Sequence, residues 1–94
     1  MSITTVAQVP TEHGSKYLQQ LCKHWSHKFE TSFDAGQGEI AFPMGPIRMT
    51  AEPEALLVEL EPNADADVER FKQVVADHLD RFAFREAPLP FDWK

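Results

Sequence analysis

The spacing of apolar residues changes at Phe29, and this change constrains the fold more than any other feature of the sequence. Before Phe29, apolar residues recur at three- and four-residue steps, as on one face of a helix. These residues are Leu18, Leu21, Cys22 and Trp25. After it, Thr31 and Phe33 continue an alternation of inward and outward residues, as in a strand with one buried face. Residues 22–30 therefore join a helix to a sheet, and they contain two of the four histidines.

Two helices are predicted from apolar periodicity and from residues that cap helix N-termini. The first spans about residues 12–26, and Thr11 can accept a hydrogen bond from an N–H group of its first turn. The second begins after Asn63, another capping residue type, and carries Asp65 and Asp67 where the helix dipole favours negative charge. Its apolar stripe consists of Val68, Phe71, Val75, Leu79 and Phe82.

Four short strands are predicted between the two helices. Glycines in residues 34–38, prolines in residues 43–46 and a proline at position 53 mark the turns. Residues predicted to face inward, apolar except for one threonine, alternate along the strands. They are Phe29, Thr31 and Phe33, then Ile40 and Phe42, then Ile47, Met49 and Ala51, and finally Leu56, Val58 and Leu60. Consecutive short strands of this kind predict an antiparallel meander whose second face contacts water.

The order of these elements, α-β-β-β-β-α, predicts the fold class. Each helix must cover the apolar face of the same sheet, so we expect an α+β two-layer sandwich, with a four-stranded antiparallel meander and two helices packed on one face. The 94 residues suffice for a single domain over residues 1–94 with one core. Residues 1–10 are interpreted as a lead-in segment, or an edge strand around residues 3–7, and residues 87–94 as an extended, proline-containing tail.

Charge and composition exclude several classes of function. A formal net charge of −6 argues against a nucleic-acid binder, which needs a basic stripe. No stretch approaches the roughly 20 apolar residues that span a bilayer, and the first residues do not resemble a signal peptide, so we expect a cytoplasmic protein without membrane contact. The single cysteine excludes an internal disulfide. No nucleophile elbow or phosphate loop occurs, so no catalytic residue or cofactor is assigned and a non-enzyme is favoured.

Two motifs, taken together, resemble a known bacterial family. The first helix ends in Leu21-Cys-Lys-His-Trp-Ser-His-Lys28, and the second ends in His78-Leu-Asp-Arg-Phe-Ala-Phe-Arg-Glu86. With the glycine-punctuated meander between them and a tryptophan near the C-terminus, the chain resembles the domain of unknown function 2218 over essentially its whole length. This family has no established activity. Similar domains occur joined to or near siderophore-interacting flavin reductases, so the resemblance implies a link to iron uptake or iron release.

The side chains of Cys22, His24 and His27 have the composition of a metal site without its geometry. At about 100° per residue, Cys22 points at least roughly 140° away from both histidines, so one ion cannot bind all three. His24 and His27 lie one turn apart and can share an ion only with further ligands from elsewhere. No metal is assigned, because a surface or capping histidine is the commoner outcome.

A groove between the two helices is the predicted ligand site. If the helices pack side by side on the sheet, His24 or His27 approaches the end of the second helix. The candidate residues are His24, His27, His78, Arg81, Arg85 and Glu86. Imidazole and guanidinium donors beside aromatic walls suit a small anionic ligand, or a carboxylate- or catecholate-rich ferric chelate.

The same residues also have a purely structural interpretation. A histidine at a helix boundary commonly packs its ring and forms a hydrogen bond to a backbone or carboxylate group. Arg81 and Arg85 have acidic neighbours with which they can form an ion-pair network that ties the helix end to the sheet. These neighbours are Glu30, Asp77, Asp80 and Glu86.

A second hypothesis is that the chain is a protein-interaction module with no small-molecule site. The polar face of the sheet is flat enough to contact another protein or another copy, as a homodimer through that face or an edge strand. The residues expected on that face are Glu30, Ser32, Glu39, Ala41, Arg48, Thr50, Leu57 and Glu59. Leu57 is the only large apolar residue among them.

Overall fold

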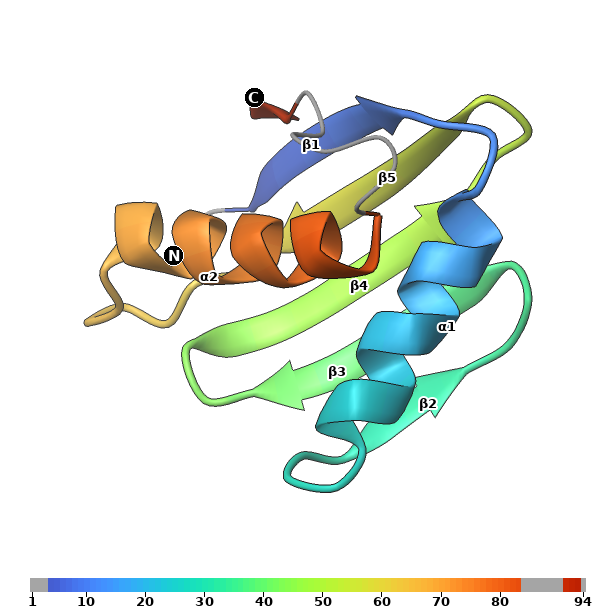
Figure 1. Cartoon of the computed structure of the whole chain (residues 1–94). Helices are drawn as coiled ribbons and strands as arrows, with labels where there is room; N and C mark the ends of the chain where they lie inside the picture. Colours follow the sequence, from blue (N-terminus) through green and yellow to red (C-terminus); the bar gives the residue numbers. More distant parts are fainter. Residues whose placement is uncertain (1–3, 84–90, 94) are drawn as a thin grey trace.

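The computed structural model of the chain describes residues 4–83 and 91–93. One antiparallel sheet carries both helices on the same face (Figure 1). In chain order, the elements are β1 (Thr5–Pro10), α1 (Gly14–Trp25), β2 (Thr31–Phe33), β3 (Gln37–Phe42), β4 (Gly45–Ala51), β5 (Ala55–Leu60), α2 (Val68–Phe82) and β6 (Asp92–Trp93). The predicted α+β class is therefore confirmed.

The sheet contains two strands more than the predicted meander. Strands β2 to β5 follow one another in space as they do along the chain, as predicted. Strand β1 then lies antiparallel to β5, and β6 lies antiparallel to β1, which gives the order β2-β3-β4-β5-β1-β6. The prediction of four strands was therefore too low, because both chain ends join the sheet.

Strand β1 is an inner strand, although its residues were interpreted as a lead-in or an edge strand. It pairs with β5 over all six of its residues, and with β6 through Ala7 and Gln8. Ala7 and Val9 are fully buried. Because Ala7 is small and the segment is short, the alternation is weak in the sequence, and pairing with β5 is what makes this segment a strand.

The core lies between the helices and one face of the sheet. Most residues predicted to face inward from β3, β4 and β5 are in it, whereas Phe42 and Ala51 are half-buried and pack against it. Those in it are each at most 1% exposed, and they are Ile40, Ile47, Met49, Leu56, Val58 and Leu60. Helix α1 contributes Leu18, Leu21 and Cys22, and α2 contributes Phe71, Val75 and Leu79. An aromatic cluster closes one end of this core, where the Trp25 and Phe42 rings are 4.7 Å apart.

Both helices begin later than predicted, because other residues take the capping positions. His13 precedes α1 without a side-chain cap bond, and the Thr11 hydroxyl instead accepts a hydrogen bond from the His13 N–H. Before α2, Asp67 accepts a hydrogen bond from the Arg70 N–H at 3.2 Å. Asn63, the predicted cap, donates its side-chain amide to a carbonyl of the β3–β4 turn. Neither helix is long and apolar enough to cross a membrane.

The described part of the C-terminal tail packs against the sheet and α2. Residues 91–93 contribute β6, whereas residues 87–90 and 94 of the predicted tail lie outside the described residues. The rings of Phe91 and Trp93 stack with centroids 5.7 Å apart, and Lys72 Nζ of α2 lies 5.8 Å from the Trp93 ring. These aromatic contacts anchor the tail beside β1.

Candidate functional site

His24 of α1 and His78 of α2 lie next to each other where the two helices meet. Their ring centroids are 5.6 Å apart, with an angle of 46° between the ring planes. The edge of the Phe82 ring packs against His24, at 5.8 Å between centroids. Two of the residues proposed from the sequence are thus brought together by the packing of α1 against α2.

His78 is held in place by both its helix and the core. Its Nδ1 lies 2.7 Å from the carbonyl oxygen of Val74, one turn earlier in α2. A carbonyl oxygen can only accept, so Nδ1 carries a proton in this bond and Nε2 is left for another partner. The half-buried His78 ring also packs 4.8 Å from the ring of Trp25. His78 therefore has the structural role expected of a histidine at a helix boundary. Its Nε2 atom takes no part in the hydrogen bond to Val74 and can still bind a ligand.

Positive charge surrounds the exposed side chain of His24. The pKa of His24 lies below its usual 6.5, first because of partial desolvation and then because of the charges of His78, Arg81, Lys28 and His27. No carboxylate is among these causes. We refer to His24, His27, Lys28, His78 and Arg81 as the basic corner.

Three residues of the basic corner, His24, His27 and Lys28, belong to a basic segment of an otherwise acidic chain. Residues 13–28 contain three lysines and no acidic residue, so they carry +3 with neutral histidines. Since the whole chain carries −6, the remaining residues carry −9. In the part of the chain that the structure describes, ion pairs join only Arg48 to Glu39 and Lys72 to Glu69, so none involves a residue of this segment. Its positive charge is therefore not neutralised within those residues.

The remaining predicted site residues are less closely placed. His27 is exposed beyond the end of α1, and its effect on His24 is electrostatic. Arg81 is exposed in the last turn of α2, and Asp77, expected to pair with it, instead accepts a hydrogen bond from the Gln73 side chain at 2.7 Å. Arg85 and Glu86 lie outside the described residues.

Cys22 is separated from the histidines, as helical geometry predicted. Its side chain is fully buried, and burial raises the pKa of its thiol to about 11. Within residues 4–83 and 91–93, no three histidine, cysteine, aspartate or glutamate side chains are grouped closely enough to hold a metal ion. The exposed charge of the basic corner, and not the thiol, is thus the chemically available feature of this end of α1.

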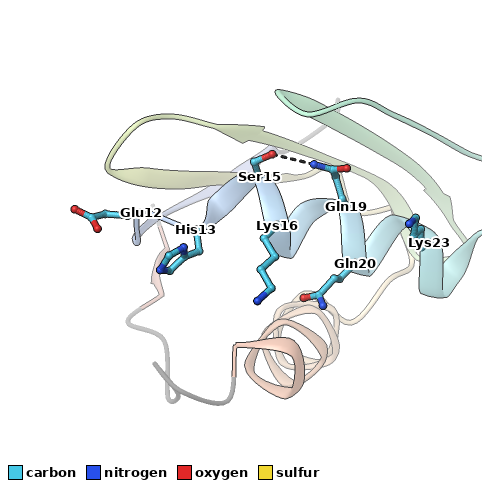
Figure 2. Close-up of a pocket in the computed structure, with 7 residues that line it drawn as sticks. All are labelled: Glu12, His13, Ser15, Lys16, Gln19, Gln20 and Lys23. Carbon is cyan, nitrogen blue, oxygen red and sulfur yellow. Dashed lines mark hydrogen bonds between the residues drawn. The ribbon is translucent and has the colours of Figure 1, made fainter.

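A hollow of about 510 Å³ lies along the exposed side of α1 and was missed in the sequence (Figure 2). Its lining residues are Glu12, His13, Ser15, Lys16, Gln19, Gln20 and Lys23. Lys16 and Gln20 point toward the last turns of α2 (Figure 2). The Oε1 atom of Gln20 is buried without a hydrogen-bond partner among the described residues, which is an unfavourable state for a polar atom. In the sequence, these residues were indistinguishable from a solvated helix face.

The second face of the sheet carries the residues expected there, together with others that were not expected, among them Val6 and Gln8 of β1. Arg48 lies opposite Glu39 on one side and Glu59 on the other, and its Nε is 3.2 Å from Glu39 Oε1. Leu57 is half-buried, and Val6 of β1 adds a second large apolar residue to this face. Val6 was missed because β1 was not recognised as an inner strand.

Fold and site together define a small α+β domain with an open-faced antiparallel sheet and a basic surface site at a helix–helix contact. The chain belongs to the bacterial family described as "Uncharacterized protein conserved in bacteria (DUF2218)", whose model matches residues 6–94. The resemblance that the two sequence motifs indicated is therefore confirmed.

A solved structure from Pseudomonas aeruginosa is similar to this one. It is the NMR structure of PA4090, which is 33% identical in sequence, with a TM-score of 0.78. The alignment covers 97% of this chain and 94% of that chain. No curated protein matches the chain. Family and fold are thus known, and a function has to rest on the chemistry of the site.

Proposed function

We propose that this domain is a binding module for a small anionic ligand, which it holds at the basic corner. The observation that carries this proposal is that His24, Lys28, His78 and Arg81 come together where α1 meets α2, and that no described residue forms an ion pair with any of them. On a chain with a net charge of −6, such a region attracts anions locally while the rest of the surface repels them.

The geometry of the corner suits a ligand that has both acidic groups and a flat apolar part. Arg81 is exposed and supplies a charged donor, and guanidinium groups bind carboxylates in a bidentate manner. The exposed His24 imidazole supplies a second donor, which becomes charged as the pH falls. The ring of Phe82 beside His24 supplies an apolar wall. A ferric chelate rich in carboxylates or catecholates is one anion with these properties, and it fits the association of similar domains with siderophore-interacting flavin reductases.

Tryptophan fluorescence provides a test, because Trp25 contacts His78 whereas Trp93 lies beside α2 near Lys72. Since the chain has two tryptophans, Trp93→Phe leaves Trp25 as the only reporter. Citrate, ferric citrate and a ferric catecholate complex are added to this variant. We expect at least one of them to change the Trp25 emission in a saturable way and to shift the amide NMR signals of His24 and Arg81.

Matched variants separate binding from folding. Arg81→Gln and His24→Gln should each weaken binding by about fivefold, which corresponds to the loss of one charged contact of about 1 kcal/mol. Arg70→Gln is the control, because Arg70 is exposed at the other end of α2. Equal affinity of all three variants, or no response to any of the three anions, would show that the corner is structural only.

The alternative function is an interaction module that forms a homodimer through the second face of the sheet. The observation in its favour is the row Glu39, Arg48 and Glu59, in which both signs of charge lie side by side next to half-buried apolar residues. Analytical ultracentrifugation of the full chain tests it: Arg48→Glu should shift a dimer to monomer, and His24→Gln should not. A monomer at every concentration would exclude this alternative. The cytoplasmic location and the lack of enzymatic activity stay predictions from the sequence.

A further inference from the structure

The outer edge of β2 carries backbone groups that face away from the sheet. Strand β2 is the terminal strand on the side opposite β6. The carbonyl of Glu30 accepts a hydrogen bond from the Ala41 N–H at 2.9 Å, and the Asp34 N–H donates to the Gln37 carbonyl at 2.8 Å. Because backbone direction alternates along a strand, residues 30, 32 and 34 face β3, and the backbone of residues 31 and 33 faces outward.

These outward groups are available to a further strand. Thr31 and Phe33 each present one N–H and one C=O on the side where no described residue pairs with β2. An unpaired edge of this kind is a template for strand addition, in which backbone hydrogen bonds provide affinity and the side chains provide specificity.

Acidic side chains determine which segment the edge can accept. Glu30, Ser32 and Asp34 point to the second face of the sheet, where Ser32 lies opposite Glu39. Glu39 is paired with Arg48, but Glu30 and Asp34 form no ion pair within the described residues. The Asp34 carboxylate accepts hydrogen bonds from the N–H groups of Gly36 and Gln37, which lower its pKa and keep it charged. The edge is therefore negative at neutral pH.

Two hollows on this face give room for side chains of an added strand. Each has a volume of about 300 Å³, and both are lined by Ser32 and Glu39. One extends to Glu30 and Arg48, and the other extends to Asp34. Every second side chain of an added strand would lie on this face, and consecutive ones would enter the two hollows.

Pairing of the edge with a second copy of itself about Ser32 is unfavourable. This two-fold antiparallel arrangement would place Glu30 of one copy opposite Asp34 of the other. Like charges directly opposite each other destabilise a strand pair. An occupant of opposite charge avoids this repulsion and complements both carboxylates.

We propose that the β2 edge accepts, as an added strand, an extended segment of another protein with lysine or arginine at alternate positions. The backbone of the segment pairs with Thr31 and Phe33, and its cationic side chains lie against Glu30 and Asp34. The side chains of Glu30, Ser32 and Asp34 lie on the face of the sheet opposite the helices, and the proposal does not rest on anion binding at the basic corner.

Amide exchange of the full-length chain tests the proposal. The probe is a capped synthetic peptide that alternates threonine and lysine, and the control peptide has glutamate in place of lysine. With the lysine peptide, we expect slower hydrogen exchange at the amides of Thr31 and Phe33, with which no described residue pairs on the outer side of β2. Protection should not increase at Ser32, which already faces β3. A response elsewhere without protection at Thr31 and Phe33 would overturn the proposal, as would equal protection by both peptides.

Variants of the edge sharpen the test. Thr31→Pro removes an outward N–H without removing a β2–β3 hydrogen bond, and it should weaken peptide binding about fivefold. Glu30→Gln combined with Asp34→Asn removes both charges while residue 34 can still accept the turn hydrogen bonds, and a similar loss is expected at low salt. The control is Glu52→Gln with Glu54→Gln, two exposed glutamates in the β4–β5 turn. Unchanged affinity in both edge variants, with melting temperatures preserved, would refute strand addition at β2.

Discussion

The Sγ atom of Cys22 lies where a side chain at residue 38 would have to go, 2.8 Å from the position of a Cβ atom on Gly38. This contact places α1 directly on β3, and Leu18 and Phe33 complete the enclosure, each with an atom 3.4 Å from the same position. With Cys22 held against the sheet, His24 must project to the opposite side of α1. The close approach of helix and strand thus determines which residues of the Cys-Lys-His-Trp-Ser-His segment reach solvent.

Gly38→Ala should destabilise the protein by about 1–3 kcal/mol, because the added methyl group overlaps a buried sulfur that cannot move away. The free energy of unfolding in urea measures this. Gly36→Ala is the matched control, since a Cβ there would meet only Asp34 Oδ1 at an ordinary 3.6 Å. In a Cys22→Ala background, the cost of Gly38→Ala should fall. Equal costs in both backgrounds would contradict the contact.

The Cys22 thiol should be inert in the folded protein. Burial raises its pKa to about 11, so at about pH 8 its thiolate fraction is roughly a hundredfold below that of an ordinary thiol with a pKa of about 9, and its surroundings also exclude reagents. A chromogenic disulfide reagent should therefore react at the rate of unfolding, and rapidly once urea is added. Fast reaction of the native protein would show that α1 opens away from β3.

Stability should decrease as the pH falls below about 6.5, because the pKa of His24 is lower in the folded than in the unfolded state. The unfolded chain then binds more protons over this window, so the contribution of His24 is present above its unfolded pKa and is lost as the pH falls through the folded one. The effect should be small, since the side chain is exposed. Urea midpoints at about pH 7.5 and about pH 5.5 measure it, and His24→Gln should reduce the difference.

An anion bound at the basic corner should raise the pKa of His24, which its surroundings in the free protein lower. It favours the charged imidazolium, so it raises the pKa of His24, and its affinity should rise as the pH falls. Titration of the His24 ring signals by NMR, with and without saturating citrate, measures both quantities. If citrate binds and leaves this pKa unchanged, the ligand site is elsewhere.

Val9→Ala should cost roughly 2 kcal/mol of stability, because it removes methyl groups from the fully buried face of β1. Val6→Ala, on the second face of the same strand, should cost clearly less, since Val6 is only half-buried. Both changes have the same effect on strand propensity, so the difference reports burial alone. Similar values for the two variants would contradict the burial of Val9 and favour the interpretation of residues 1–10 as a lead-in segment.

Much of the architecture could be predicted because it follows from the spacing of apolar residues within single helices and strands. The change from helix to strand, most inward residues of β3 to β5 and the separation of Cys22 from His24 all follow from spacing along one element, and all are observed. Strand β2 begins at Thr31 and not at Phe29, which lies in the turn before it. Segments whose structure depends on distant partners were not predictable in this way. Strand β1 is made by pairing with β5, and β6 by pairing with β1.

The candidate site, like the fold, could be predicted only in those features that depend on neighbouring residues in the sequence. Charge composition alone marked residues near His24 and Arg81 as basic, but whether they meet depended on how α2 lies against α1. The hollow beside Gln20 had no signal in the sequence, because polar residues at helical spacing are typical of any solvated face. Arg85 and Glu86 stay candidates from the sequence, outside the described residues.

By itself, the sequence determined the fold class, the helix-to-strand corner and the family, because amphipathic periods and short motifs are local properties of the chain. Only the tertiary structure decided that β1 and β6 join the sheet, that His24 lies beside His78 and that no described strand pairs with the outer, acidic edge of β2. The physical reason is that strand partners and helix packing are set by burial of apolar surface between segments far apart in the chain. The free energy of that burial is gained only when the segments come together in the core, so it cannot be recognised in the sequence of any one segment.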